Sequence, residues 1–373
     1  MWSYLVQRLL RLHASDVLRR IVGRSKLLSS GDCVRAMSLF RRKPKPADSE
    51  TLTVDGHQLL DSGDPQAAVA LFDSAVALDP ENALAWFGKG GAHDALAQYE
   101  EAIGAYLQSV QFAGENAGLP LYNLGNLYQK QDQLQDAARC FHEATKADPE
   151  MADAWINLGR IVDDEGQHAE AVEYYDTALK IVPEDVMAWS NRGNSLRGLQ
   201  RFEDSLASYQ QALQIDEEDI AARIGIGACL MECDRPQEGI AALAAVVRDT
   251  DHPLALAEYA TALAATGQHA DALSCYDRVI DEGMESAEIL SNRGECLAAL
   301  GQPDASLESF ERSIEIDSAC SAAWFGQARV LVNANRIEEA KPVAQQYWDL
   351  IDEAKRSNPA VQAMMVICGV LVE

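Results

Sequence analysis

Asparagines recur at a fixed interval in otherwise apolar surroundings. Asn123, Asn157 and Asn191 stand 34 residues apart, and Asn157 lies within the stretch ADAWINLGRI at 152–161. A carboxamide both donates and accepts a hydrogen bond and carries no charge. A row of such groups therefore suits the recognition of a polypeptide main chain, because it satisfies successive peptide units whatever side chains the peptide carries.

Residue types that serve catalysis or metal binding form no comparable pattern. The eight cysteines include no CxxC pair and no Cys/His set at zinc spacing. Cys229 and Cys233 are typical of small buried residues in a reducing compartment. No GxSxG element, Walker loop, HExxH helix or dinucleotide fingerprint occurs. His168 and His269 are expected to be exposed turn residues. We therefore expect no enzyme activity, no metal and no cofactor.

The charge is divided unevenly along the chain. The formal net charge is −27, yet residues 1–45 hold eleven Lys/Arg against only Asp16 and Asp32. That balance of +9 leaves −36 for the remainder. An acidic body repels phosphate groups at long range. We therefore expect no nucleic-acid binding by the body, and separate roles for the two parts.

The asparagines belong to repeats of about 34 residues. An element that combines an aromatic residue with a following glycine, or a degraded form of it, recurs as AWFGKG (85–90), LYNLG (121–125), AWINLG (154–159), AWSNRG (188–193), IGIG (224–227), LSNRG (290–294) and AWFGQA (323–328). A second element follows each time, in which an aromatic residue stands between two small ones, as in Ala171, Tyr175 and Ala178. The apolar residues of each unit recur at helical spacing, which predicts two antiparallel helices per unit, joined by a turn. Pro65, Pro236 and Pro303 fall in the first turn of the second helix, where no amide proton is needed.

These elements resemble the tetratricopeptide repeat family. The resemblance implies an all-α, right-handed α-solenoid of about nine helix-turn-helix units, starting near residues 49, 83, 118, 152, 186, 220, 253, 287 and 321. The expected domains are a basic N-terminal extension (1–48), the solenoid (49–352) and a C-terminal capping helix (353–373). Units one, six, seven and nine match least well. Pro342 is expected to kink or restart the second helix of the last unit.

The apolar run at residues 360–372 has two interpretations. It is too short to span a bilayer. A helix that caps the open end of the stack accounts for it, because terminal elements of a solenoid are atypical. Contact with a membrane surface is the alternative.

A helical wheel separates the two faces of the first helix. At about 100° per residue, Trp155, Leu158, Gly159 and Val162 form one packed face, and Asn157 and Arg160 point away from it. The candidate peptide- or partner-binding residues on this outer face are Asn123, Asn126, Asn157, Arg160, Asn191, Asn194 and Asn292.

The resemblance assigns a use to this outer face. In the tetratricopeptide repeat family it lines a concave groove that binds extended peptides. The asparagine row resembles the ladder in the repeats of O-linked N-acetylglucosamine transferases, although asparagine at this position is also common without a ligand. Asp153 and Asp164 beside Arg160 argue against a clamp for acidic tails. A basic or neutral peptide suits the carboxylates further along the face, Glu232, Glu258, Glu288 and Glu295.

The segment MWSYLVQRLLRLHASDVLRRIV at the N-terminus leaves several alternatives open. Residues 1–30 are compatible with a basic amphipathic helix on an anionic membrane and with an organellar transit peptide. They are also compatible with a disordered tail or a segment that docks on the acidic repeats. Arg8 and Arg11 interrupt the apolar residues, so no secretory signal is predicted. We expect a cytoplasmic protein, with a peripheral membrane or organellar location as the alternative.

The sequence thus favours a non-catalytic scaffold or adaptor that binds an extended peptide or partner segment. A membrane-associated assembly or regulatory factor, anchored by the basic N-terminus, is the alternative. A regulatory subunit of a separate enzyme is a weaker one. The sequence names neither the partner nor the oligomeric state.

Overall fold

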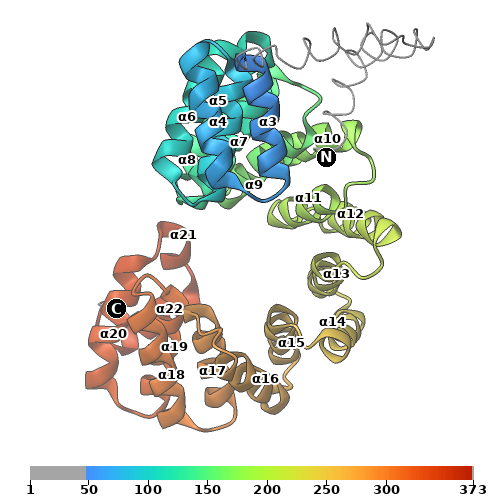
Figure 1. Ribbon diagram of the computed structural model, residues 1–373. Coiled ribbons are helices and arrows are strands. Elements are labelled where there is room, and N and C mark those ends of the chain that lie inside the picture. The colour runs from blue at the N-terminus through green and yellow to red at the C-terminus, as the bar shows by residue number, and fades with distance from the viewer. Residues whose placement is uncertain (1–47, 372–373) are drawn as a thin grey trace, which may run out of the picture. The chain divides into compact units, whose positions relative to one another are not determined.

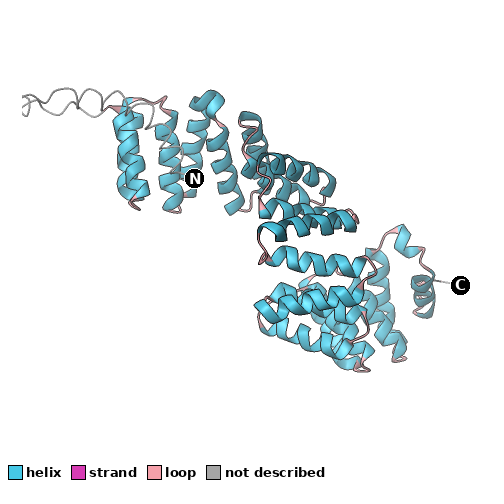
Figure 2. Ribbon diagram, turned by 90° about the vertical axis from the view of Figure 1, so that its right-hand side faces the viewer, coloured by secondary structure: helices cyan, strands magenta, loops and turns pink. Residues whose placement is uncertain are grey.

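The computed structural model describes residues 48–371, and every regular element in this range is a helix (Figure 1, Figure 2). The chain divides into two compact units, Met1–Phe112 and Ala113–Glu373. The basic segment at residues 1–47, with its alternative interpretations, lies outside the described residues.

The helices come in nine consecutive pairs within the described range. The first helices are α3 (Ser49–Asp61), α5 (Ala83–Ala95), α7 (Gly118–Lys130), α9 (Ala152–Asp164), α11 (Val186–Gly198), α13 (Ile220–Glu232), α15 (Pro253–Ala265), α17 (Ala287–Ala299) and α19 (Ser321–Asn333). The second helices are α4 (Pro65–Leu78), α6 (Tyr99–Ala113), α8 (Leu134–Ala147), α10 (His168–Ile181), α12 (Phe202–Ile215), α14 (Pro236–Thr250), α16 (His269–Asp281), α18 (Pro303–Ile316) and α20 (Ile337–Leu350). From α7 to α20, each helix packs against the next one along the chain. The predicted all-α fold of repeated helix pairs is confirmed.

The same local signals delimit the helices in every pair. The residue fifteenth from the start of each first helix has a positive φ and reverses the chain, as Gly166 does at 79° and Gln200 at 59°. Several first helices are capped by a side chain; the carboxylate of Asp185, for example, accepts a hydrogen bond of 2.8 Å from the backbone N–H of Ala188. The connections are therefore short, and each second helix folds back on its first.

A buried aromatic ring fixes the distance between the helices of a pair. Tyr209 of α12 is fully buried, and a Cβ added to Gly193 of α11 would lie 2.5 Å from its ring. A Cβ added to Gly225, on the first helix of the next pair, would lie 2.3 Å from the same ring. The ring thus occupies the space between two glycines. Phe72 between Gly56 and Gly88, and Phe310 between Gly294 and Gly326, repeat the arrangement.

Trp155 does not lie in the core as the helical wheel predicted. Leu158, Gly159 and Val162 are buried, whereas Trp155 is only half-buried and Ile156 is buried in addition. The indole N–H donates a hydrogen bond of 3.1 Å to the carbonyl of Pro149. Because a buried indole needs such an acceptor, the ring remains at the edge of the pair. Trp86, Trp189 and Trp324 make the equivalent bond.

Pro342, where a kink or a restart of the second helix of the ninth unit was predicted, does not restart that helix. Helix α20 runs unbroken from Ile337 to Leu350 with Pro342 inside it. The missing N–H would have bonded the carbonyl of Glu338, which lies in the exposed first turn where water serves as the donor.

The C-terminal apolar run packs against the last pair. After the short helix α21 (Glu353–Arg356), α22 (Pro359–Ile367) contacts α20. Val361, Met364 and Met365 are buried in the same cluster as Tyr347 of α20. These side chains cover the end of the stack, as the capping interpretation predicted.

Adding a methyl group beside the ring should destabilise the fold. We expect Gly193→Ala to lower the free energy of unfolding by ~1–3 kcal/mol, because the new Cβ and the Tyr209 ring compete for one space. Gly104→Ala in α6 is the control: no atom lies within 4 Å of its Cβ position. It should raise stability by ~0.5–1 kcal/mol through its helix propensity. Urea denaturation followed by circular dichroism measures the free energy of unfolding of both variants. Equal changes in the two variants would contradict the close packing of the Tyr209 ring against Gly193.

Candidate functional site

The candidate residues lie on a surface that we call the first-helix face. It consists of positions 2, 6 and 9 of the first helices in the second compact unit, where position 1 is the first helical residue. Positions 2, 6 and 9 follow one another on one side of a helix. The consecutive first helices from α9 to α19 contact each other, and Asn157 links α9 to α7. The face is therefore continuous along this unit.

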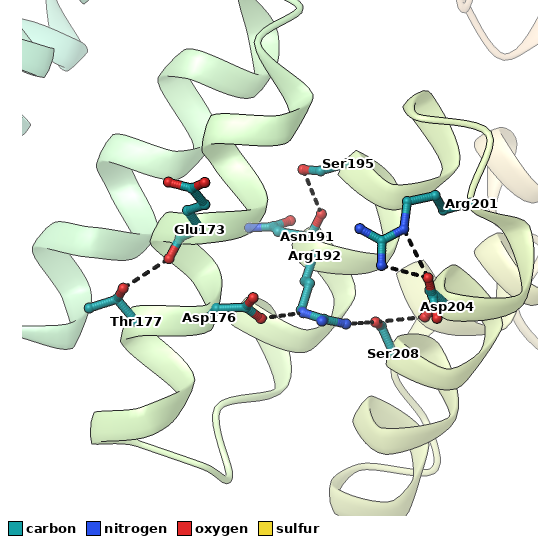
Figure 3. Close-up of polar contacts among 9 residues, drawn as sticks. All are labelled: Glu173, Asp176, Thr177, Asn191, Arg192, Ser195, Arg201, Asp204 and Ser208. Carbon is teal, nitrogen blue, oxygen red and sulfur yellow. Dashed lines mark hydrogen bonds and ion pairs between the residues drawn. The ribbon is translucent and has the colours of Figure 1, made fainter.

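Position 6 carries an asparagine in four units, and the amide groups of two of these are free within residues 48–371. Asn123, Asn157, Asn191 and Asn292 are all half-buried. No side-chain hydrogen bond to Asn123 or Asn191 occurs within residues 48–371. Figure 3 shows Asn191 on α11, with its backbone carbonyl accepting a hydrogen bond of 3.2 Å from Ser195. The two carboxamides thus keep their donors and acceptors for another molecule or for water.

The other asparagines are partly engaged within the protein. Nδ2 of Asn157 donates to Oδ1 of Asn126 over 3.2 Å, which joins position 6 of one unit to position 9 of the unit before it. The hydroxyl of Tyr209 donates to Oδ1 of Asn194 over 2.6 Å. The structure thus brings Asn126 and Asn157 together, while the exposed Asn194 and Arg160 stand one turn beyond position 6.

Asn292 belongs to a second polar group on the face. It hydrogen-bonds the hydroxyl of Tyr276, and burial raises the pKa of that hydroxyl to about 12. The hydroxyl also lies 3.0 Å from Oγ1 of Thr261 at position 9 of the preceding unit. Asn292 therefore has a structural partner that Asn123 and Asn191 lack.

The row of asparagines is interrupted on α13 for a steric reason. Gly225 occupies position 6 there, and the Tyr209 ring fills the place of a side chain. Ala221 and Ala228 stand at positions 2 and 9, so this helix presents only small residues. The face is thus divided into an amide-rich part on α7, α9 and α11 and a second part from α13 onward.

Position 7 holds cations that the sequence did not single out. Nε of Arg192 lies 2.7 Å from Oδ1 of Asp176 on α10, and its Nη1 donates to Oγ of Ser208 on α12 over 2.6 Å (Figure 3). Arg293 repeats this bridge to Asp277 and Ser309. These guanidinium groups join three helices and are not available to a ligand. In the sequence, the pattern that could have revealed these bridges is an Arg at position 7 with an Asp sixteen residues before it.

Unpaired carboxylates lie on both parts of the face. Burial, with a smaller contribution from Glu288, raises the pKa of the half-buried Glu258, and Arg197 opposes this shift. Burial and the nearby Asp185 likewise raise the pKa of Asp153. No ion pair of Asp153, Glu258 or Glu288 occurs in the described part of the chain. Glu295, by contrast, is paired with Arg329 of the next unit.

Large apolar side chains at position 2 were missed by the sequence reading. Leu119, Met187 and Leu254 are 39%, 57% and 46% exposed. Each lies one turn before position 6, so apolar and amide or carboxylate groups are neighbours on the face. They recur two repeat units apart. The comparison of repeats that identified the asparagines could therefore have identified these residues as well.

The cysteines of the described residues are buried or half-buried; Cys229 is buried, as predicted, whereas Cys233 is half-buried. Burial raises the pKa of the Cys140 and Cys296 thiols to about 11. Among residues 48–371, no group of three His, Cys, Asp or Glu side chains could hold a metal ion. No helix in the same range is long and apolar enough to cross a bilayer.

His168 is not the exposed turn residue that was predicted. It is half-buried, its Nδ1 lies 2.8 Å from Oδ1 of Asp163, and its ring packs against Gly198 of the next unit. The next unit covers His168, because the turn between α9 and α10 lies against Gly198 of that unit.

Family models match more than half of the chain. A tetratricopeptide repeat model matches residues 56–117, 122–186, 258–319 and 297–349, and a second such model matches 186–219. The matches leave 220–257 uncovered, the region of α13 and α14 where the asparagine row is interrupted. A search of curated protein sequences finds no match.

The chain is also similar to solved structures. One is a tetratricopeptide repeat protein from Parabacteroides merdae, with 17% identity, coverage of 76% of this chain and 98% of that chain, and a TM-score of 0.53. Another is yeast Tom70, with 13% identity, coverage of 87% and 88%, and a TM-score of 0.48. At 17% identity, the likeness to the Parabacteroides merdae protein shows the fold. The repeated helix pairs, the ring between paired glycines and the family matches together show that this chain belongs to the tetratricopeptide repeat family.

Proposed function

We propose that this chain is a non-catalytic adaptor that binds an extended peptide or partner segment along the first-helix face. Its repeats make it a protein-interaction scaffold of a general kind. The observation that carries the finer proposal is the pair Asn123 and Asn191, whose half-buried carboxamides have no partner within the described residues. Half-buried polar groups of this kind gain free energy when a ligand supplies the missing hydrogen bonds.

The dimensions of the face suit an extended chain. Neighbouring packed helices lie about 8–10 Å apart, which is the length of about three extended residues. Successive asparagines would therefore meet every third peptide unit of the ligand. The bridges from Arg192 and Arg293 to both neighbouring second helices keep this spacing fixed, so the face is organised before a ligand arrives.

The charge of the face favours a basic or neutral partner. Asp153, Glu258 and Glu288 have no ion pair in residues 48–371, and the basic groups at position 7 are occupied by Asp176 and Asp277. An acidic partner would bring like charges together, which costs affinity and slows association.

Replacing the asparagines should weaken partner binding and leave the fold intact. We expect Asn123→Ala, Asn157→Ala and Asn191→Ala together to weaken capture of a protein partner about tenfold or more, since each lost hydrogen bond is worth ~0.5–1.5 kcal/mol. The melting temperature should stay nearly constant, because within residues 48–371 the only side-chain bond lost is the one from Asn157 to Asn126.

A matched triple variant separates this face from the opposite one. Gln135→Ala, Glu173→Ala and Gln211→Ala remove exposed side chains from α8, α10 and α12, the second helices of the same three units. Pull-down with the tagged full chain, quantified by mass spectrometry, compares the two variants. Unchanged capture by the asparagine variant, or an equal loss with both, would refute the proposal.

Glu258 gives a pH-dependent prediction. Its folded-state pKa is raised by burial, so the folded state favours the protonated carboxyl, and this contribution is lost as the pH rises through the raised pKa. Glu258→Gln should therefore raise the urea midpoint at about pH 8 and change it little at about pH 3.5, below the ordinary range of a Glu carboxyl. A gain that is the same at both pH values would contradict the burial argument.

A further inference from the structure

Position 2 of the first-helix face alternates along the second compact unit. Large apolar side chains occupy every other unit: Leu119 on α7, Met187 on α11 and Leu254 on α15, all exposed by more than a third. The units between them carry Asp153 on α9 and the small Ala221 on α13, while Glu288 on α17 follows Leu254 and the small Ala322 on α19 comes last. From α7 to α19 the order is therefore apolar, acidic, apolar, small, apolar, acidic, small, so large apolar residues alternate as far as α15.

These side chains are available to a partner. Leu119, Met187 and Leu254 belong to no buried cluster, and Met187 and Leu254 remain exposed although α11 and α15 are packed on both sides. The carboxylates of Asp153 and Glu288 make no ion pair among residues 48–371. Burying an exposed aliphatic side chain contributes ~1.5–3 kcal/mol when it is complete, so three such contacts would be a large part of a peptide's affinity.

The spacing translates the alternation into a sequence rule for the ligand. One unit corresponds to about three residues of extended chain. Apolar contacts in alternate units are thus about six ligand residues apart, and Asp153 lies midway between Leu119 and Met187. A basic ligand residue there would be paired with Asp153, while the residue opposite Ala221 meets no charge. A basic residue about three positions beyond the contact with Leu254 would be paired with Glu288.

We propose that the preferred partner of this face is an extended peptide with large aliphatic residues six positions apart and Lys or Arg midway between them. This inference rests on the proposed function and adds its specificity. The aliphatic residues contact Leu119, Met187 and Leu254. The basic residues pair with Asp153 and Glu288. Glu258, one turn from Leu254 on α15, adds a further negative charge. The asparagines at position 6 bind the peptide main chain and do not select its sequence.

Two synthetic peptides of one composition test the rule. In the first peptide, every third residue is alternately Leu or Lys, and the residues between them are Ser and Gly. This order is the same in both chain directions. In the second, the Leu residues are grouped together and the Lys residues are grouped together. Fluorescence anisotropy with the full chain measures both affinities. We expect the alternating peptide to bind about tenfold or more tightly; equal affinity, or no binding of the alternating peptide, would overturn the rule.

Variants assign the preference to position 2. Met187→Ala with Leu254→Ala should remove the preference without lowering the melting temperature, because both side chains are exposed. Ile215→Ala with Ile316→Ala is the matched control: these apolar residues end α12 and α18 and are 40% and 44% exposed. A preference that survives the first pair, or is lost with the second, would overturn the assignment.

The same measurements separate this rule from the function on which it rests. If both peptides bind equally and both lose affinity in the triple asparagine variant, the face binds peptides without this specificity. If binding is insensitive to the asparagines, the proposed function itself fails.

A charge-reversed peptide tests the role of the carboxylates. Replacing Lys by Glu in the alternating peptide should abolish binding, and Asp153→Asn with Glu288→Gln should restore part of it. An acidic peptide that binds the unmodified chain as well as the basic one would contradict the charge argument.

Discussion

The structure depends on one steric constraint, the aromatic ring that lies between two first helices. In the fifth unit the ring of Tyr209 fills the space beside Gly193 of its own pair and Gly225 of the next. Because neither position has room for a Cβ, the ring determines how closely a second helix approaches both first helices. The spacing of the first helices, and hence of every group on their exposed face, follows from this contact.

The same constraint explains where the face is interrupted. A ring in close contact with position 6 leaves no space for a side chain, which is why Gly225 follows Tyr209 and the asparagine row stops at α13. The Tyr209 hydroxyl donates a hydrogen bond to Asn194 of its own helix pair. Where position 6 carries an asparagine, position 2 of the same helix, one turn before it, carries an aliphatic or acidic residue. Core packing and surface chemistry are therefore set by the same few positions.

Much of this was predictable because helix packing leaves a periodic record in the sequence. The fixed interval of aromatic and small residues predicted the helix pairs, and the wheel placed Leu158, Gly159 and Val162 in the core. It failed for Trp155, because angular position ignores the indole N–H and its need for the Pro149 carbonyl. It also missed the bridge from Arg192 to Asp176, since contacts between neighbouring units depend on how they stack.

Peptide binding along the first-helix face is the central claim, and a photo-crosslinker placed on each face tests it most directly. A benzophenone side chain at the exposed Asn194 of α11 would stand on the proposed face, and one at the exposed Glu173 of α10 would stand on a second helix. Irradiation in cells followed by mass spectrometry should yield a crosslinked partner peptide from position 194 and none from 173. Crosslinks from position 173 alone, or equally from both, would contradict the account.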